Sequence, residues 1–392
     1  MTKEVRRYGV VAAVLDGRMT NGEAAAALGI SVRQVKRIKG KVKREGPSGV
    51  RHGNRDRPSS RAFPSDLKER VIALANEKYF DFNFSHLSEM LSEQEGIEIN
   101  RETLRQWLRP SGFGGKVRKQ RRHRKRRKRS EKEGQMLFLD GSPHQWFGDE
   151  KSTLLLSTDD STGKPLYGLF QKEEDLDGCF HVSREVFTCF GRPSVYYLDR
   201  ASQFVTTRHK SDYVAEPTQF QRAMSELGIR LIFANSPQAR GRGERINRTF
   251  QDRLVAELRL AKITSHEEAT KYLNETFIPK YCRLFGVAPE DPEPAWRVLS
   301  DADIRNVLCK RYGAKVNYDN TISADGQTLQ LFPTKTRLSF AKAQVTVNHW
   351  LDGTWHVFHH TAGEVPCRPI PGRVRPESSR HSRLASEARA SL

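Results

Sequence analysis

Residues 135–171, QMLFLDGSPHQWFGDEKSTLLLSTDDSTGKPLYGLFQ, decide the fold of this chain. The runs QMLFLDGS, STLLLSTDD and KPLYGLFQ are short and apolar and end in turn residues, which predicts three strands joined by tight connections. Beyond them, SVYYLD at 194–199 and IRLIFA at 229–234 are two further strand-like runs. Helical patterns cover 176–190, 217–227, about 238–260 and 265–284. This order predicts an α/β unit with a mixed sheet and helices on both faces.

Three carboxylates fall at special places in this pattern. Asp140 closes the first predicted strand, Asp199 closes the fourth, and Glu244 lies in the opening turn of a helix crowded with arginines. If the fourth strand pairs beside the first, the two aspartates emerge at the same end of the sheet. Converging carboxylates repel one another unless cations neutralise them, so the pattern favours a two-metal site for phosphoryl transfer.

A plainer interpretation exists for each acidic residue. Asp140 and Asp199 can be turn residues at strand ends, and Glu244 can simply complement a helix dipole. Asp159 and Asp160 compete as carboxylates, but the sequence DDSTGK is typical of a hairpin turn. His144 is near Asp140 and more typical of a loop or supporting residue than of a ligand.

The first 45 residues predict three short helices. Thr20 with Glu23, and Ser31 with Gln34, fit capping boxes at two of the helix starts. Two helices separated by Gly-Ile-Ser predict a helix-turn-helix, for which the alternative is a small bundle with a solvated basic face. The second of these helices would present four residues to a DNA major groove: Arg33, Gln34, Lys36 and Arg37.

A second helical unit and a basic run follow. Residues 65–109 predict three helical segments, the last capped by Asn100, and resemble another helix-turn-helix or a purely structural bundle. In the run 116–129, eleven of fourteen positions are Lys or Arg, out of a net charge of +20 for the chain. The run is a disordered tract, a localisation signal or a segment that lies on phosphates, and we favour the last. The DNA-contact residues expected here are Arg101, Arg105, Arg122, Arg126 and Arg127.

The remaining features bound the class of protein. Residues 315–331 and 343–360 alternate apolar and polar residues around Asp-Gly turns, which predicts a small β-barrel. Five scattered cysteines without a C-x-x-C pair are typical of a reducing compartment, and zinc is not expected. Without a long apolar run or a signal-like leader, we expect a soluble intracellular protein with no membrane partner.

Three motifs together carry a family resemblance. FLDGSPHQW, YLDRASQF and NSPQARGRGERINRTF resemble the catalytic motifs of the DDE transposases of insertion sequences (ISNCY-like, integrase catalytic core), within the retroviral-integrase superfamily. Over residues 135–285, the order of elements resembles the ribonuclease-H-like core of that superfamily. The residues at matching family positions are Pro237, Gln238, Gly241, Glu244 and Asn247.

The resemblance implies a function. Asp140, Asp199 and Glu244 would be the catalytic and metal-binding triad for two Mg²⁺ ions, which Mn²⁺ can replace, with Asp140 bridging both ions. Arg245 and Arg248 would contact DNA. The protein would be a transposase that cleaves element ends at terminal inverted repeats and transfers the strands into double-stranded target DNA. It would act as a homo-oligomer on DNA in the bacterial cytoplasm, associated with the nucleoid.

Some features depart from the family pattern. The spacing between Asp199 and Glu244 is longer than usual, Gln251 stands where many members have a cation, and Arg200 replaces the usual Asn or Gly. Two alternatives stay open: a catalytically silent DNA-binding regulator derived from a transposase, and a stand-alone ribonuclease-H-like nuclease.

The patterns divide the chain into eight predicted segments. These are a helix-turn-helix domain (1–45), a linker (46–62), a second helix-turn-helix-like domain (63–112), a basic linker (113–133), the ribonuclease-H-like core (134–285), a connecting helical segment (286–313), the β-barrel (314–362) and a disordered tail (363–392).

Overall fold

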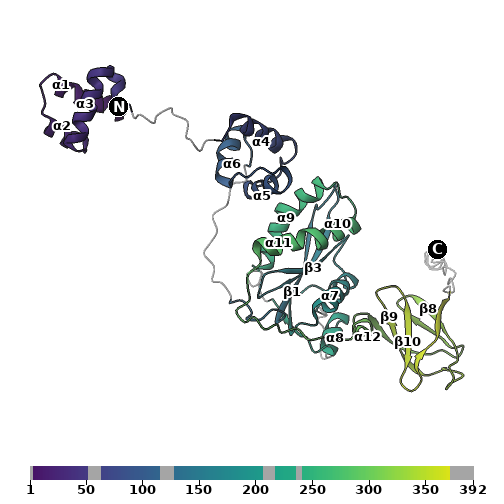
Figure 1. The fold of residues 1–392 in the computed structure, drawn as a ribbon. Coiled ribbons are helices and arrows are strands. Elements are labelled where there is room, and N and C mark those ends of the chain that lie inside the picture. The colour runs from purple at the N-terminus through teal and green to yellow at the C-terminus, as the bar shows by residue number, and fades with distance from the viewer. Residues whose placement is uncertain (1–2, 52–62, 115–127, 206–216, 235–240, 371–392) are drawn as a thin grey trace, which may run out of the picture. The chain divides into compact units, whose positions relative to one another are not determined.

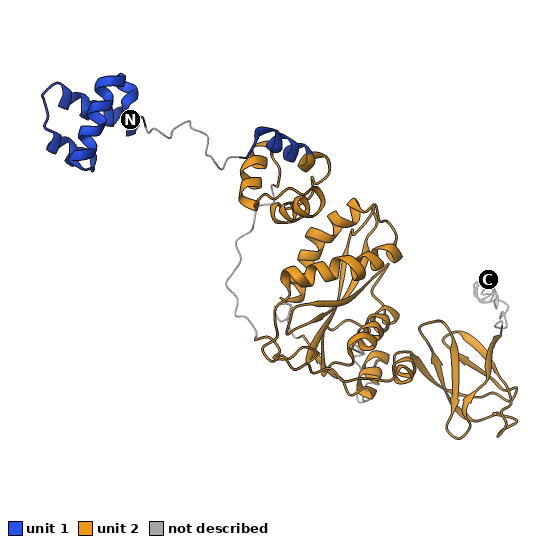
Figure 2. Ribbon diagram, viewed as in Figure 1, with its two compact units in different colours: residues 1–73 blue, residues 74–392 orange. Residues whose placement is uncertain are grey.

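The structure is a computed structural model that describes residues 3–51, 63–114, 128–205, 217–234 and 241–370. The chain divides into two compact units, Met1–Ala73 and Leu74–Leu392, shown in blue and orange in Figure 2. The division falls inside helix α4, Ser65–Glu77. Each unit is described in turn.

The first unit begins with a three-helix bundle. Helix α2 starts in a complete capping box: the Glu23 N–H donates to Thr20 Oγ1, and the Thr20 N–H donates to Glu23 Oε2. It ends at Gly29, whose φ of 63° is the left-handed conformation that a helix-turn-helix turn requires. Ser31 then caps α3 through the Gln34 N–H. The helices are α1 Lys3–Leu15, α2 Asn21–Leu28 and α3 Val32–Glu45.

The predicted linker 46–62 is wrong for its first residues. Gly46–Val50 form a 3₁₀ helix, η1, and Val50 is buried in one core cluster with Val11. Gly49 permits this packing, because a Cβ at this position would lie 2.6 Å from the carbonyl carbon of Lys41. Composition alone indicated a flexible segment, and the close backbone approach is a tertiary feature.

We expect Gly49→Ala to destabilise this bundle by about 1–3 kcal/mol, since the added methyl group overpacks against the α3 backbone. Gly40→Ala is the matched control, because a Cβ there meets nothing within 4 Å. Alanine in a helix interior should stabilise by up to about 1 kcal/mol. Amide hydrogen exchange of α3 in the full chain measures both effects, and equal protection in the two variants would contradict this packing.

The second helical segment contains the three predicted helices. Asn83 and Asn100 cap the helices α5 and α6 by accepting hydrogen bonds from backbone N–H groups. Leu104 and Leu108 of α6 are buried. After α4, the elements are α5 Phe84–Glu95, α6 Arg101–Leu108 and the 3₁₀ turn η2 Arg109–Ser111.

The predicted mixed sheet is present, with strand order β3-β2-β1-β4-β5 (Figure 1). The first three strands pair antiparallel, whereas β4 pairs parallel to both β1 and β5. The strands are β1 Met136–His144, β2 Ser152–Asp159, β3 Pro165–Gln171, β4 Val195–Leu198 and β5 Arg230–Phe233.

Helices cover both faces of this sheet, as predicted. Leu155 packs in the core formed with α7, α8 and α12, whereas its neighbours Leu154 and Leu156 pack in the core formed with α9, α10 and α11. This alternation follows from the pleat of a strand. The helices are α7 Leu176–Phe190, α8 Gln219–Glu226, α9 Gly243–Leu260, α10 His266–Tyr272, the π-helical segment η4 Leu273–Phe277, α11 Ile278–Phe285 and α12 Asp301–Val307.

Two boundaries near the acidic residues differ from the prediction. Strand β1 does not close at Asp140 but continues to His144, because β2 pairs with it as far as Ser152. Pro143 is tolerated there because the pairing with β4 stops at Phe138, so β4 does not need its N–H. Helix α9 begins at Gly243, after a turn at 241–242.

The C-terminal strands do not form the predicted closed barrel. They form two sheets, with orders β11-β10-β9-β6 and β12-β8-β7, which share one hydrophobic core. The hairpin at Asp325 and Gly326 is confirmed, with φ values of 49° and 75° that match a type I′ turn. The strands are β6 Lys310–Lys315, β7 Thr321–Ala324, β8 Gln327–Leu331, β9 Gln344–His349, β10 Trp355–His359, β11 Gly363–Val365 and β12 Cys367–Ile370.

The predicted disordered tail is wrong for its first eight residues. Residues 363–365 and 367–370 form β11 and β12, which pair with β10 and β8. These strands are short and carry charges, so they lack a core pattern of their own and are ordered by their partners. In the part of the chain that the structure describes, no helix is long and apolar enough to cross a membrane.

Candidate functional site

The pairing of β1 with β4 brings Asp140 and Asp199 together. The parallel register runs from Met136 opposite Val195 to Phe138 opposite Tyr197. Asp140 lies two residues beyond Phe138 in β1, and Asp199 directly follows Leu198, the last residue of β4. Continuation of the same register would set them side by side on chains about 4.8 Å apart. The rings of Phe138 and Tyr197 touch with centroids 5.5 Å apart. Because side chains alternate along strands, the two aspartates share the face of these rings.

Helix α9 lies over this face. Asn247 Nδ2 donates to Asp140 Oδ2 at 2.9 Å, and Gln251 Nε2 donates to Ser142 Oγ at 3.1 Å. Asn247 and Gln251 are four residues apart in the helix, and their partners Asp140 and Ser142 are two residues apart in the strand. About one turn of α9 therefore spans two residues of β1. Gly243 lies close to the same carboxylate, since a Cβ on it would be 3.5 Å from Asp140 Oδ2.

Glu244 is exposed in the first turn of α9, one turn before Asn247 on the same stripe of the helix. Among the described residues, no three His, Cys, Asp or Glu side chains form a group that could hold a metal ion. Asp140 bonds Asn247, and Asp199 accepts the Ala201 N–H at 3.1 Å. Helix α9 therefore begins beside Asp140 at Gly243, and Glu244 lies in its exposed first turn.

Apolar contacts hold α9 in this position. Ile246, Phe250 and Leu254 are buried and pack with Trp146 of the loop after β1. The indole N–H of Trp146 donates to the Ser142 carbonyl at 3.0 Å, which ties that loop back to β1. The apolar stripe of α9 is thus fixed in the core, which holds Asn247 and Gln251 against β1.

Sequence reasoning missed Glu174, which lies between β3 and α7. Its Oε1 accepts a hydrogen bond from Gln203 Nε2 at 2.5 Å. Its carboxylate also lies against Gly141, in the space that the Cβ of any other residue at this position would occupy. The pKa of the Cys179 thiol is raised, first by burial and then by the negative charges of Glu174, Asp175 and Asp199. Glu174 thus links the loop after Asp199 to the residue after Asp140. No local motif marks this link, because its members are far apart in the sequence.

The competing carboxylates are structural, in agreement with the hairpin interpretation. Asp159 accepts hydrogen bonds from the N–H groups of Gly134 and Thr162. Burial raises the pKa of Asp159, because its effect exceeds the lowering by these hydrogen bonds. Asp160 Oδ2 accepts from the Ser130 N–H at 2.8 Å, and its other oxygen pairs with Arg242. His144 ends β1 with its ring against Trp146, at a centroid distance of 5.3 Å.

The predicted DNA-contact residues have different surroundings. Arg105 forms hydrogen bonds to Glu102 of its own helix. The residues Arg122, Arg126 and Arg127 lie outside the described residues. The exposed predicted contacts are Arg33, Gln34, Lys36, Arg37, Arg101, Arg245 and Arg248.

Comparison with known proteins gives the class. Residues 6–59 match the family model described as a helix-turn-helix domain. The chain is 34% identical over 355 residues to the "Putative transposase y4bF" of Sinorhizobium fredii (strain NBRC 101917 / NGR234), covering 90% of this chain and 78% of the relative. It is 31% identical over 342 residues to the transposase for insertion sequence IS1202 of Streptococcus pneumoniae, covering 76% of this chain and 72% of the relative.

The chain belongs to the family of insertion-sequence transposases, as its three motifs indicated. Its helix-turn-helix region is a DNA-binding domain. Among solved structures, the integrase catalytic core domain of HTLV-2 in complex with magnesium is similar with a TM-score of 0.30 and 15% identity. That match covers 37% of this chain and 85% of the integrase chain.

We expect Gly141→Ala to destabilise the chain by about 1–3 kcal/mol, because the new methyl group would collide with the Glu174 carboxylate. Adding Glu174→Ala should recover most of this loss, since it removes the colliding group. Urea unfolding of the full chain measures both. A double variant no more stable than Gly141→Ala would show that Glu174 does not cover this glycine.

Proposed function

We propose that this transposase cleaves the ends of its element and joins them to target DNA by phosphoryl transfer at Asp140, Asp199 and Glu244. The observation that supports the proposal is the β1–β4 register, whose continuation past Phe138 and Tyr197 would set Asp140 beside Asp199, with Gly243 of α9 next to the Asp140 carboxylate. Hard oxygen donors on rigid elements are the ligands that Mg²⁺ prefers. The donor set therefore fits a divalent ion better than a soft metal.

Each residue then has a role. Asp140, Asp199 and Glu244 would together hold the ions through their carboxylate oxygens. The chemistry that two bound divalent ions, Mg²⁺ or Mn²⁺, supply in such a site is activation of the attacking oxygen and stabilisation of the leaving one. Asn247 keeps the Asp140 carboxylate oriented through the 2.9 Å hydrogen bond. Arg248, on the same helix face as Glu244, would bind a phosphate of the scissile strand.

The helical units would recognise the terminal inverted repeats. In α3, Val35 and Ile38 are buried while Arg33, Lys36 and Arg37 are exposed, so the basic face is available to a major groove. The exposed Arg101 gives α6 a similar role in the second segment. Because two element ends must be joined, we propose that the protein works as a homo-oligomer on DNA.

Neutralising any member of the triad should abolish strand joining while leaving DNA binding intact. We expect Asp140→Asn, Asp199→Asn and Glu244→Gln each to reduce joined product on the order of a thousandfold. Glu150→Gln is the control, since Glu150 is exposed on the same core in the loop after β1. The measurement is strand transfer with end oligonucleotides and Mg²⁺ or Mn²⁺. Undiminished joining by Asp140→Asn would refute the assignment.

The α3 face should determine sequence preference. We expect Arg37→Ala to weaken binding to the terminal repeat by about 1–3 kcal/mol while binding to unrelated DNA changes less. Lys3→Ala removes an exposed cation from α1 of the same bundle and serves as the control. Titrations at one fixed salt concentration test this. Equal losses on repeat and unrelated duplexes would place Arg37 on the phosphates rather than on bases.

A further inference from the structure

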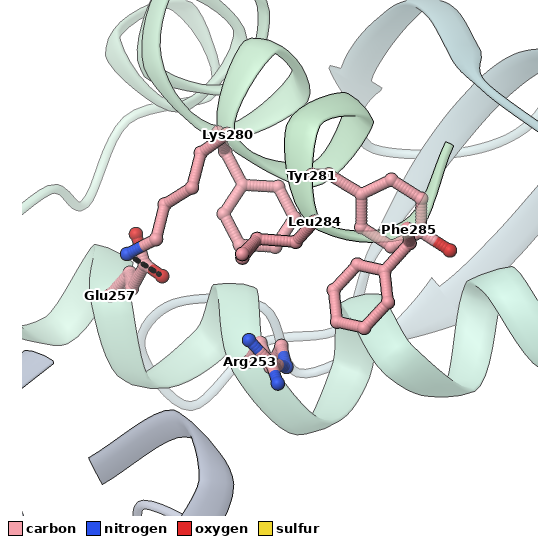
Figure 3. Close-up of a pocket in the computed structure, with 7 residues that line it drawn as sticks. Arg253, Glu257, Lys280, Tyr281, Leu284 and Phe285 are labelled. Carbon is pink, nitrogen blue, oxygen red and sulfur yellow. Dashed lines mark hydrogen bonds and ion pairs between the residues drawn. The ribbon is translucent and has the colours of Figure 1, made fainter. Parts of the chain in front are cut away.

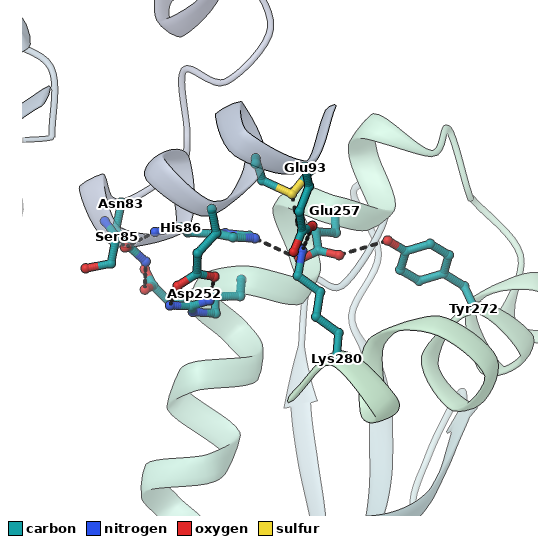
Figure 4. Close-up of polar contacts among 11 residues, drawn as sticks. Asn83, Ser85, His86, Glu93, Asp252, Glu257, Tyr272 and Lys280 are labelled. Atoms are coloured by element: carbon teal, nitrogen blue, oxygen red, sulfur yellow. Dashed lines mark hydrogen bonds and ion pairs between the residues drawn. The ribbon is translucent and has the colours of Figure 1, made fainter. Parts of the chain in front are cut away.

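A buried charged cluster joins the second helical segment to the helix that carries Glu244. The carboxylate of Glu257 in α9 is 3% exposed and has three partners (Figure 4). His86 Nε2 of α5 lies 2.7 Å from Oε1, the Tyr272 hydroxyl donates to Oε2 at 2.8 Å, and Lys280 Nζ of α11 lies 3.3 Å from Oε1. Side chains from four helices therefore meet on one carboxylate.

The cluster needs α5 to be stable. Burial alone would raise the pKa of Glu257, but the His86 hydrogen bond and the Lys280 charge outweigh burial, so the pKa is lowered. Lys280 also reaches Glu93 Oε2 of α5 at 2.8 Å. His86 is itself fully buried, and its Nε2 faces the Glu257 carboxylate, which as an ionised group accepts hydrogen bonds. Removing α5 would take away the His86 hydrogen bond to Glu257 and the Glu93 contact of Lys280, and breaking contacts of a buried charged cluster is costly.

Further polar contacts flank the cluster along the same two segments. Arg253 donates from two nitrogens to the Glu89 carboxylate, at 2.5 and 3.1 Å. Its guanidinium also lies 4.8 Å from the Phe285 ring centre, where Arg253, Lys280 and Phe285 line a small hollow between α9 and α11 (Figure 3). The other contacts are Asn83 to Asp252 at 2.6 Å and Arg259 to Asp81 at 2.6 and 2.9 Å.

Helix α9 thus has two attached halves. Its N-terminal half lies on β1 through Asn247 and Gln251, and its C-terminal half lies on α5 through Arg253 and Glu257. The helix is continuous over 18 residues. Glu244 and Glu257 are thirteen residues apart, or about 20 Å along the helix axis.

We propose that these contacts between 81–93 and 252–280, hereafter the α5–α9 seam, set the distance between the DNA sequence bound by the second helical segment and the phosphodiester that is cleaved. The inference rests on the proposed function. Glu257 and His86 are positioning residues, since they act through α9 and touch no DNA in this scheme. A merely structural seam would support folding without fixing the cleavage position.

The test uses the full chain and end duplexes with one to three base pairs inserted before the cleaved terminus. Footprinting first identifies the DNA segment that wild type protects and Arg101→Ala does not. The extra base pairs are inserted between this segment and the cleaved terminus. We expect wild-type cleavage to stay at a constant distance from that segment, and Glu257→Gln to spread it over neighbouring positions. Glu275→Gln, which removes an exposed carboxylate from the segment between α10 and α11, should behave as wild type.

Charge exchange provides a second readout that does not need activity. Glu89→Arg and Arg253→Glu should each speed amide exchange in α5 roughly tenfold, and the double variant should recover part of this protection. If the single variants exchange α5 amides like wild type, or if the double variant recovers no protection, the proposed role of the α5–α9 seam is overturned.

The two proposals fail differently. Wild type that cleaves end duplexes with the same spread of positions as Glu257→Gln would overturn the distance-setting role and leave the proposed function standing. Wild type that cleaves no end duplex would overturn both, whatever the exchange measurement shows.

Discussion

The parallel pairing of β1 with β4 is the constraint on which the rest of this structure depends. It joins the antiparallel strands to the helix-connected strands, and continuation of its register would align Asp140 with Asp199. A shift of one residue in either strand would turn one aspartate into the opposite core. The apolar neighbours Leu139 and Leu198, both buried in that core, oppose such a shift.

Helix α9 converts this alignment into a candidate site. Its apolar stripe is buried, and Asn247 contacts Asp140 directly. The same helix meets α5 through a buried carboxylate. One element therefore carries Glu244, contacts Asp140 and holds the second helical segment, which links the DNA binding proposed for that segment to the chemistry proposed for the core.

The sequence predicted the sheet, the helices on both faces and the helix-turn-helix caps, because strand runs, periodicity and capping residues are local signals. Three spaced motifs also identified the family. Tertiary features escaped prediction: the packing of η1 at Gly49, the extension of β1 by β2, and the strands β11 and β12, which are ordered only by their partners. Glu174 and the Glu257 cluster escaped for the same reason, since their partners are distant in sequence.

The most direct measurement of the central claim is anomalous diffraction from crystals of the full chain containing Mn²⁺. The account predicts manganese density within about 2.2 Å of carboxylate oxygens of both Asp140 and Asp199, with Glu244 turned toward it. Manganese bound at other carboxylates, with none between these two aspartates, would contradict the account.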